Sequence, residues 1–204
     1  MLTPVYHNPA LPAPEMTIIN AALNLLFRTS VQHLTMTQVY KAAGVSKATL
    51  YQYFSGKADL SAALLIEEAR LRLHEMQALP ATPTQEDWAG LLHERLQSPQ
   101  KQRVLSSLAQ VVNDTPDAWP RKTEWQSMEQ QVQAMMMDCL HRTTGNQALS
   151  TAQLCQRWAM WECSLVGWLH QYRDSAFRDL IGDRKQFVHA LAEQGADMLC
   201  QSRR

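Results

Sequence analysis

The residues best suited to chemistry lie close together, in the stretch "AAGVSKATLYQYFSGKADL" at residues 42–60. Gly44 can adopt the left-handed backbone that a sharp turn needs. Ser46 is placed to cap the helix that follows, with Lys47, Ala48 and Thr49 on its first turn. Short side chains and one flexible cation at that position can enter the major groove of DNA without clashing. The pattern therefore predicts a helix-turn-helix.

The charge pattern favours a DNA-binding role for this segment over mere helix packing. No Asp or Glu occurs between Met16 and Ala58, while several Lys and Arg do. Leu50 and Phe54 are predicted to face inward, which leaves Tyr51 and its neighbours Gln52 and Tyr53 off that inner face, within reach of phosphates. The whole chain has zero net charge, so one surface is free to meet phosphates and the rest is balanced.

The elements around this segment are predicted to be helices throughout. The apolar periodicity and stop signals give helices at about 15–29, 38–43, 47–54, 57–79, 85–97, 99–112, 121–142, 150–175 and 183–201. Thr37 is the expected N-cap of the second helix, and residues 176–182 are expected to be a connection. The fold class is therefore all-α. We expect a flexible proline-rich arm at 1–14, a DNA-binding domain at 15–60 and a regulatory domain at 61–204.

Composition limits the remaining function classes. The chain has 204 residues, of which 46% are hydrophobic and 19% charged, as in globular proteins. No signal segment or membrane-length apolar run is present, and the four Cys are not in Cys-x-x-Cys spacing, so we expect a soluble cytoplasmic protein with reduced, mostly buried thiols.

Two arrangements that would suggest an enzyme or a metal sensor are weak. Cys163, His170 and Asp174 share a helix, but no glycine-rich elbow or phosphate loop accompanies them. Cys139 and His141 are two residues apart on a helix, so they point to different faces. We expect no catalytic site, no cofactor and no metal.

Residues 35–60, "TMTQVYKAAGVSKATLYQYFSGKADL", resemble the DNA-binding signature of the TetR family of bacterial transcription regulators. The matching positions are Thr37, residues 43–46, residues 49–51, Tyr53, Phe54, Lys57 and Leu60. The resemblance implies a homodimeric repressor that binds a palindromic operator and is released by a small molecule. The DNA contacts it implies come from Thr37, Gln38, Ser46, Lys47, Ala48, Thr49, Tyr51, Gln52, Tyr53 and Lys57.

Two departures from the family pattern affect the expected docking. Tyr40 stands where the family usually has a small residue, so its ring must push two helices apart or swing outward. Residues 1–14 contain no Lys or Arg, although many members carry basic residues there. The zero net charge of the chain and this non-basic arm support the alternative function, a protein-binding adaptor with a TetR-like fold.

The regulatory region is rich in aromatic and sulfur side chains, which suit a pocket for a hydrophobic or aromatic ligand. Two apolar stripes, one in the helix at 121–142 and one in the helix at 150–175, are predicted to form facing walls. Glu162 could receive a cationic group there, and each of these residues is also a plausible core residue. The candidate ligand residues are Trp88, Trp125, Met128, Met135, Trp158, Trp161, Glu162 and Trp168. The last two helices are expected to form the dimer interface, with the small residues around Gly195 against their own kind.

Overall fold

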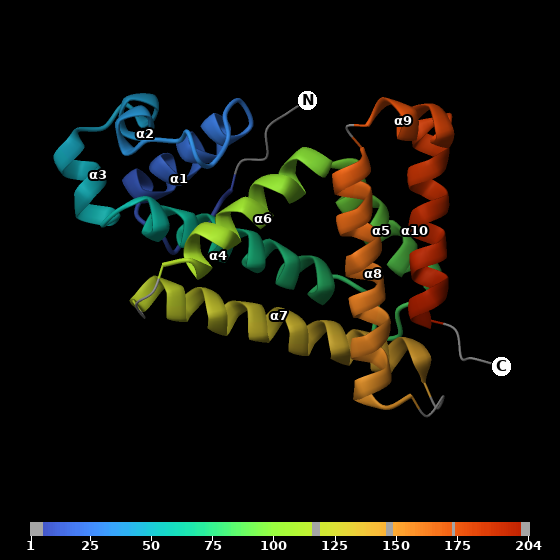
Figure 1. The fold of residues 1–204 in the computed structure, drawn as a ribbon. Coiled ribbons are helices and arrows are strands. Elements are labelled where there is room, and N and C mark those ends of the chain that lie inside the picture. Colours follow the sequence, from blue (N-terminus) through green and yellow to red (C-terminus); the bar gives the residue numbers. More distant parts are fainter. Residues whose placement is uncertain (1–5, 116–118, 146–148, 173, 201–204) are drawn as a thin grey trace. The chain divides into compact units, whose positions relative to one another are not determined.

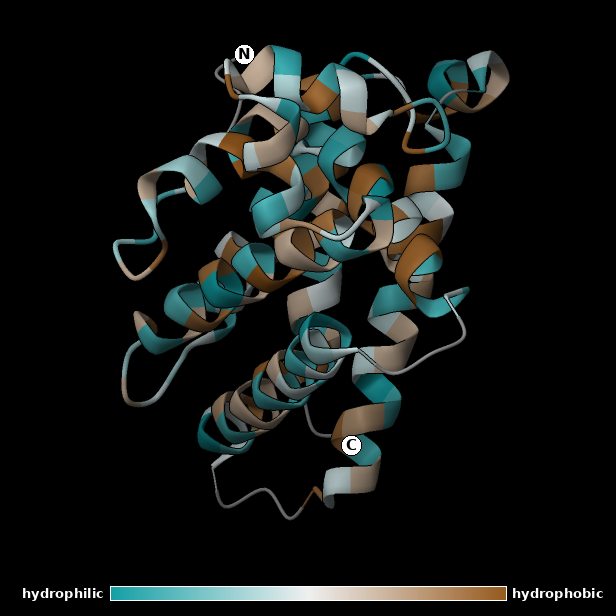
Figure 2. Cartoon of the chain, turned by 90° about the vertical axis from the view of Figure 1, so that its left-hand side faces the viewer, coloured by the Kyte–Doolittle hydropathy of each residue, from teal (hydrophilic) through white to brown (hydrophobic). Residues whose placement is uncertain are grey.

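The computed structural model describes residues 6–115, 119–145, 149–172 and 174–200. These residues form ten α-helices and no strand, which confirms the all-α fold class (Figure 1). The helices are α1 (Ala13–Leu26), α2 (Met36–Ala43), α3 (Lys47–Tyr53), α4 (Lys57–Gln77), α5 (Gln85–Gln97), α6 (Pro99–Asn113), α7 (Pro120–Thr144), α8 (Thr151–Gln171), α9 (Ser175–Ile181) and α10 (Arg184–Cys200). Hydrophobic and hydrophilic segments alternate along them, as expected of helices that bury one face (Figure 2).

The chain divides into two compact units. The first unit comprises residues 1–71 and 103–130, and the second comprises residues 72–102 and 131–204. Helices α4, α6 and α7 each contribute residues to both units. The sequence-based division at residue 60 lies inside the first unit, so the separation into DNA-binding and regulatory domains stays a prediction.

Local capping signals fix the helix-turn-helix in the first unit. Thr35, rather than the predicted Thr37, is the N-cap of α2. Its hydroxyl accepts from the backbone N–H of Gln38, and the side-chain oxygen of Gln38 accepts from the backbone N–H of Thr35. Gly44 ends α2 in the left-handed conformation at φ 67° and ψ 25°. Ser46 caps α3 as predicted, with its Oγ accepting from the Thr49 N–H at 3.0 Å.

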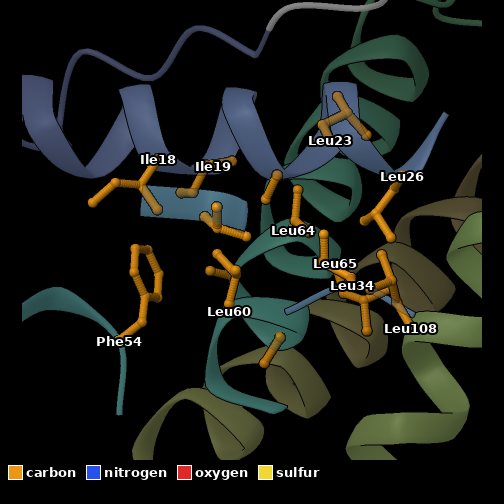
Figure 3. Close-up of a cluster of buried hydrophobic side chains, with 14 of the residues drawn as sticks. Ile18, Ile19, Leu23, Leu26, Leu34, Phe54, Leu60, Leu64, Leu65 and Leu108 are labelled. Atoms are coloured by element: carbon orange, nitrogen blue, oxygen red, sulfur yellow. The ribbon is translucent and has the colours of Figure 1, made fainter. Parts of the chain in front are cut away.

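The core of the first unit holds α1, α2 and α3 against α4 and α6. Ile18, Ile19 and Leu23 of α1 are buried beside Leu60 and Leu64 of α4 (Figure 3). Further members of the cluster include Leu26, Leu34, Leu50, Phe54, Leu65 and Leu108. Each fully buried side chain of this size contributes about 1.5–3 kcal/mol relative to an exposed one. The inner face of α3 is thereby fixed, so its outer face has a defined direction.

The described part of the N-terminal arm is docked, which corrects the prediction of a flexible arm for those residues. Tyr6 is only 2% exposed, and its hydroxyl donates to Glu68 of α4 at 3.0 Å. The Tyr6 backbone and the Asn20 side chain of α1 exchange two hydrogen bonds, and Asn8 donates to Glu67. Helix α1 starts at Ala13, two residues earlier than predicted. Residues 1–5 of the predicted arm lie outside the described residues.

The second unit is organised around α10, which packs along α5 and also meets α8 and α9. Gly195 of α10 is buried, and a Cβ atom there would lie 2.5 Å from the Trp161 ring and 2.9 Å from Leu92. Ala192 and Ala196 beside it are buried too. The small-residue face is therefore used inside the subunit, and the prediction that it meets a second copy is wrong.

The connection predicted at 176–182 contains a helix. Asp174 caps α9, because its side chain accepts from the Phe177 N–H at 3.0 Å. Helix α8 correspondingly ends at Gln171, earlier than predicted. A short helix thus joins α8 to α10.

Candidate nucleic-acid interface

The outer face of α3 carries a set of side chains that a DNA groove can accommodate. Lys47, Ala48 and Gln52 are exposed, and Tyr51 is 46% exposed. The Lys47 ammonium lies 5.9 Å from the centre of the Tyr51 ring, so the cation and the phenol occupy one patch. This arrangement offers phosphate contacts from Lys47 and Tyr51 beside a small residue that allows close approach.

Other predicted contact residues have partners within the helix-turn-helix. The Thr49 hydroxyl lies 2.8 Å from Ser46 Oγ, so both hydroxyls belong to the cap of α3. The side-chain oxygen of Gln38 accepts from the Thr35 backbone and hydroxyl, both at 2.9 Å. Thr37 is exposed on α2 and remains free to approach a backbone phosphate. The cap residues therefore position the surface, and their DNA contacts stay predictions.

Two aromatic residues differ from the sequence-based expectation. Tyr53 is half-buried against the core of the first unit, so its ring is less available than that of Tyr51. Tyr40 is also half-buried against this core, so its ring does not point fully into solvent. With Tyr40 in place, α2 still packs against both α1 and α3. Its ring is therefore part of the packing of the helix-turn-helix.

Lys57 at the start of α4 has a structural partner. Its ammonium donates to the backbone carbonyl of Gln32 at 3.0 Å. The bond ties the loop between α1 and α2 to α4. A phosphate contact from Lys57 would have to be made by its remaining N–H groups, since an ammonium has three donors.

Asp59, the first carboxylate that follows α3 in the sequence, is hydrogen-bonded to residues outside α3. Asp59 accepts from the Ser55 N–H at 2.8 Å and from the Ser55 hydroxyl at 3.0 Å. Its other oxygen accepts from Arg121 of α7 at 2.6 Å. Arg121 and Asp59 are 62 residues apart, and no motif in the sequence indicated that they meet. Sequence reasoning therefore missed both as residues that hold the interface.

The comparison with known proteins agrees with this geometry. The sequence profile described as "Bacterial regulatory proteins, tetR family" matches residues 18–64, which include all of α2 and α3. The match covers the helix-turn-helix and the helices on either side of it, so this segment is similar to the DNA-binding domain of the TetR family. No curated protein matches the sequence.

Two solved structures share the fold over most of the chain. The fatty acid degradation regulator FadR from Bacillus halodurans is 16% identical, with a TM-score of 0.63, over 92% of this chain and 98% of that one. NalD from Pseudomonas aeruginosa, the secondary repressor of the MexAB-OprM multidrug efflux pump, is 18% identical, with a TM-score of 0.55, over 89% and 93%. These two likenesses show that the all-helical fold of this chain is shared with both proteins.

The predicted ligand residues are divided between the two units. Trp125 and Met128 pack against the core of the first unit, where the Trp125 indole donates to Glu129 at 3.3 Å. Trp88 is fully buried in the second unit, and its indole donates to Thr143 at 2.7 Å. Met135, also on α7, is half-buried. Their role in ligand binding stays a prediction.

The tryptophans of α8 contact helices other than the one predicted to face them. Trp161 is fully buried and lies against Leu92 and Gly195. The Trp168 indole donates to the Leu96 carbonyl at 3.3 Å, and its ring is 5.4 Å from that of Phe187. These contacts are with α5 and α10, whereas the predicted opposite wall was on α7. They do not support two facing walls.

Trp158 and Glu162 form a different arrangement, centred on Arg95 of α5. The Arg95 guanidinium lies 5.5 Å from the centre of the Trp158 ring and makes an ion pair of 3.1 Å with Glu162. Trp158 is half-buried. Glu162 already has a cationic partner, so a positively charged ligand would have to replace Arg95 to bind there.

The thiols differ in accessibility, and one differs from expectation. Cys139 is buried, Cys155 and Cys200 are half-buried, and Cys163 is exposed. Burial raises the pKa of the Cys200 thiol to about 11.

In the described parts of the chain, no group of three or more His, Cys, Asp and Glu residues is arranged to hold a metal. None of the helices described there is both long and apolar enough to cross a membrane.

Proposed function

We propose that this regulator is a homodimeric repressor that binds a palindromic operator through α3 and leaves it when a small hydrophobic or aromatic ligand binds. The observation that carries the proposal is the outer face of α3, where Lys47, Ala48 and Tyr51 are exposed on a helix fixed by Ser46. Two such helices related by a two-fold axis would enter successive major grooves. With an operator as its target, the protein is expected to act in the cytoplasm.

The decisive experiment measures binding to genomic DNA. Fragments retained by the purified protein are sequenced, and the affinity for the recovered site is measured by fluorescence anisotropy over a range of salt concentrations. Lys47→Ala should weaken binding and reduce the salt slope by about two units, because each of the two subunits loses one phosphate contact. Lys185→Ala is the matched control, since Lys185 is an exposed lysine on α10. Equal affinity and slope for both variants and the wild type would contradict the proposed interface.

The exposed apolar face of α8 supports dimer formation through the last long helices. Met160 is 49% and Val166 59% exposed, and the small residues Ala159, Cys163 and Gly167 are exposed beside them. These residues follow one another at helical spacing, as in a seam between packed helices. The sequence predicts that the face around Gly195 meets a second copy, but that face is buried inside the subunit, so the α8 face takes its place here.

The dimer is tested by placing a charge on this face. Val166→Glu should shift sedimentation at micromolar concentration from dimer toward monomer, because burying an unpaired carboxylate is unfavourable. Gln126→Glu on α7, also exposed, adds the same charge elsewhere and should leave the dimer intact. A wild-type protein that is monomeric at this concentration would contradict the dimer.

The ligand proposal rests on the half-buried apolar residues Met135 and Trp158. An accessible tryptophan beside a salt-bridged arginine suits a ligand with an aromatic or aliphatic body. Titration with hydrophobic and cationic aromatic compounds should quench tryptophan fluorescence, and Trp158→Phe should reduce that quenching. The adaptor alternative would be favoured if no genomic fragment is retained at low salt.

A further inference from the structure

The guanidinium of Arg121, in the first turn of α7, joins three elements of the helix-turn-helix. It donates to Glu15 of α1 at 2.9 Å and to Asp59 of α4 at 2.6 Å. It also donates to the backbone carbonyl of Tyr53, the last residue of α3, at 3.3 Å. The same group lies 4.9 Å from the centre of the ring of Phe54, the C-cap residue of α3. One side chain therefore holds the C-terminal end of the DNA-facing helix against α1 and α4.

These contacts are sheltered from water, which separates them from ordinary surface ion pairs. The side chains of Arg121, Glu15 and Asp59 are 23%, 11% and 15% exposed. Two acidic groups share one cation at this site, and the second oxygen of Asp59 fixes the turn after α3 through Ser55. Removing the cation would leave two largely buried carboxylates without their partner, which is unfavourable.

The position of Arg121 on α7 gives this arrangement a consequence for regulation. Helix α7 is continuous from Pro120 to Thr144, and its residues pass from the first unit into the second at residue 131. Trp125, one turn after Arg121, is buried in the core of the first unit. The start of α7 is thus part of the first unit, so a displacement of this helix must strain or break the Arg121 contacts.

We propose that Arg121 is a positioning residue for DNA binding, which sets the orientation of α3 and transmits movements of α7 to it. The inference rests on the proposed function of α3 as the DNA-facing helix. Arg121 acts through the Tyr53 carbonyl, Glu15 and Asp59 rather than by touching DNA. A planar guanidinium fork can hold two carboxylates and a carbonyl at fixed angles, which a single ammonium cannot.

Arg70 provides a matched control in the same unit. It makes ion pairs with Glu67 at 3.5 Å and with Glu124 of α7 at 3.3 Å, and neither partner belongs to α3. Its side chain is 40% exposed. Loss of Arg70 therefore removes a link between α4 and α7 without removing the one to α3.

The test compares Arg121→Gln, Arg121→Lys and Arg70→Gln at a temperature where far-UV circular dichroism shows each to be fully folded. Arg121→Gln should bind the operator at least about tenfold more weakly than wild type, with less than a threefold loss on random duplex DNA. Arg121→Lys should recover part of that loss, and Arg70→Gln should bind within twofold of wild type. Hydrogen exchange should be faster in α3 of Arg121→Gln and unchanged in Arg70→Gln.

A triple variant keeps the test decisive if Arg121→Gln does not fold. Glu15→Gln and Asp59→Asn, added to Arg121→Gln, remove all three charges together, and the same loss of operator affinity is expected. Operator binding within twofold of wild type by the folded single or triple variant, with α3 exchange unchanged, would overturn the inference alone. A wild-type protein that retains no DNA would instead overturn the proposed function and this inference with it.

Discussion

The close approach of α10 to α8 and α5 makes Gly195→Ala an informative substitution. Replacing a glycine inside a helix by alanine ordinarily stabilises a protein by about 0.5–1 kcal/mol. Here the added Cβ would lie 2.5 Å from two ring carbons of Trp161 and 2.9 Å from a Leu92 methyl carbon. Carbon atoms pack best at about 3.5–4.0 Å, so the methyl group overlaps its neighbours by about 1 Å.

The two effects have opposite signs, and the overlap should prevail. Overpacking a buried site costs about 1–3 kcal/mol, and the upper half of that range applies because a rigid, fully buried ring cannot turn away from the new methyl group. Subtracting the helix-propensity gain of about 1 kcal/mol leaves Gly195→Ala about 1–2 kcal/mol less stable than wild type.

Gly90→Ala is the matched control for this experiment. Gly90 is an exposed residue inside α5, and apart from its own helix no atom lies within 4 Å of the position its Cβ would take. The same substitution should therefore gain about 0.5–1 kcal/mol there. Urea unfolding followed by circular dichroism, at one protein concentration, gives both free energies. If Gly195→Ala were as stable as Gly90→Ala, α10 could not pack against Trp161 as closely as described.

Three further changes test other parts of the structure. Ser46→Ala should lower the unfolding free energy by about 1 kcal/mol in urea unfolding, because α3 loses its cap, and it should weaken operator binding in anisotropy. Burial raises the pKa of Glu67 above its ordinary value of 4.5, so its charged form is unfavourable in the folded protein. Glu67→Gln should therefore be more stable than wild type at pH 7, and it should lose this advantage as the pH falls through the raised pKa toward 4.5. Urea unfolding between pH 4 and 8 measures the difference. In the Val166→Glu variant, where the α8 face is not covered by a second copy, iodoacetamide at pH 8 should label exposed Cys163 before Cys200 in mass spectra, since burial raises the Cys200 pKa to about 11.

Helix ends set by local chemistry were the most predictable features of this chain. Gly44 and Ser46 act as predicted because the turn and the cap involve neighbouring residues only. The bounds of α5 also agree with the prediction, with Thr84 as its cap. The N-cap of α2 was misplaced by two residues, because Thr35 and Thr37 have the same capping chemistry. The Gln38 side chain decides between them, since it completes a capping box with Thr35.

The outer face of α3 was predictable for a similar reason, whereas its support was not. Helical spacing places Leu50 inside, and Tyr51 is consequently exposed. Arg121 reaches Asp59 across 62 residues of chain, and no local pattern marks such a pair. Its importance depends on the path of the backbone, which brings the start of α7 to the end of α3.

The ligand-binding residues were the least predictable, because an apolar stripe shows that a helix buries one face but not which element covers it. The indole N–H groups separate the tryptophans in a way that the stripe does not. Those of Trp88, Trp125 and Trp168 donate to groups within their own units, as expected of indoles fixed in a core. Trp158 differs, because it is half-buried and covered on one face by the side chain of Arg95 rather than by the core. Displacing Arg95 would cost the subunit less than opening the core around the other three, so a ligand that enters the second unit should meet Trp158 first.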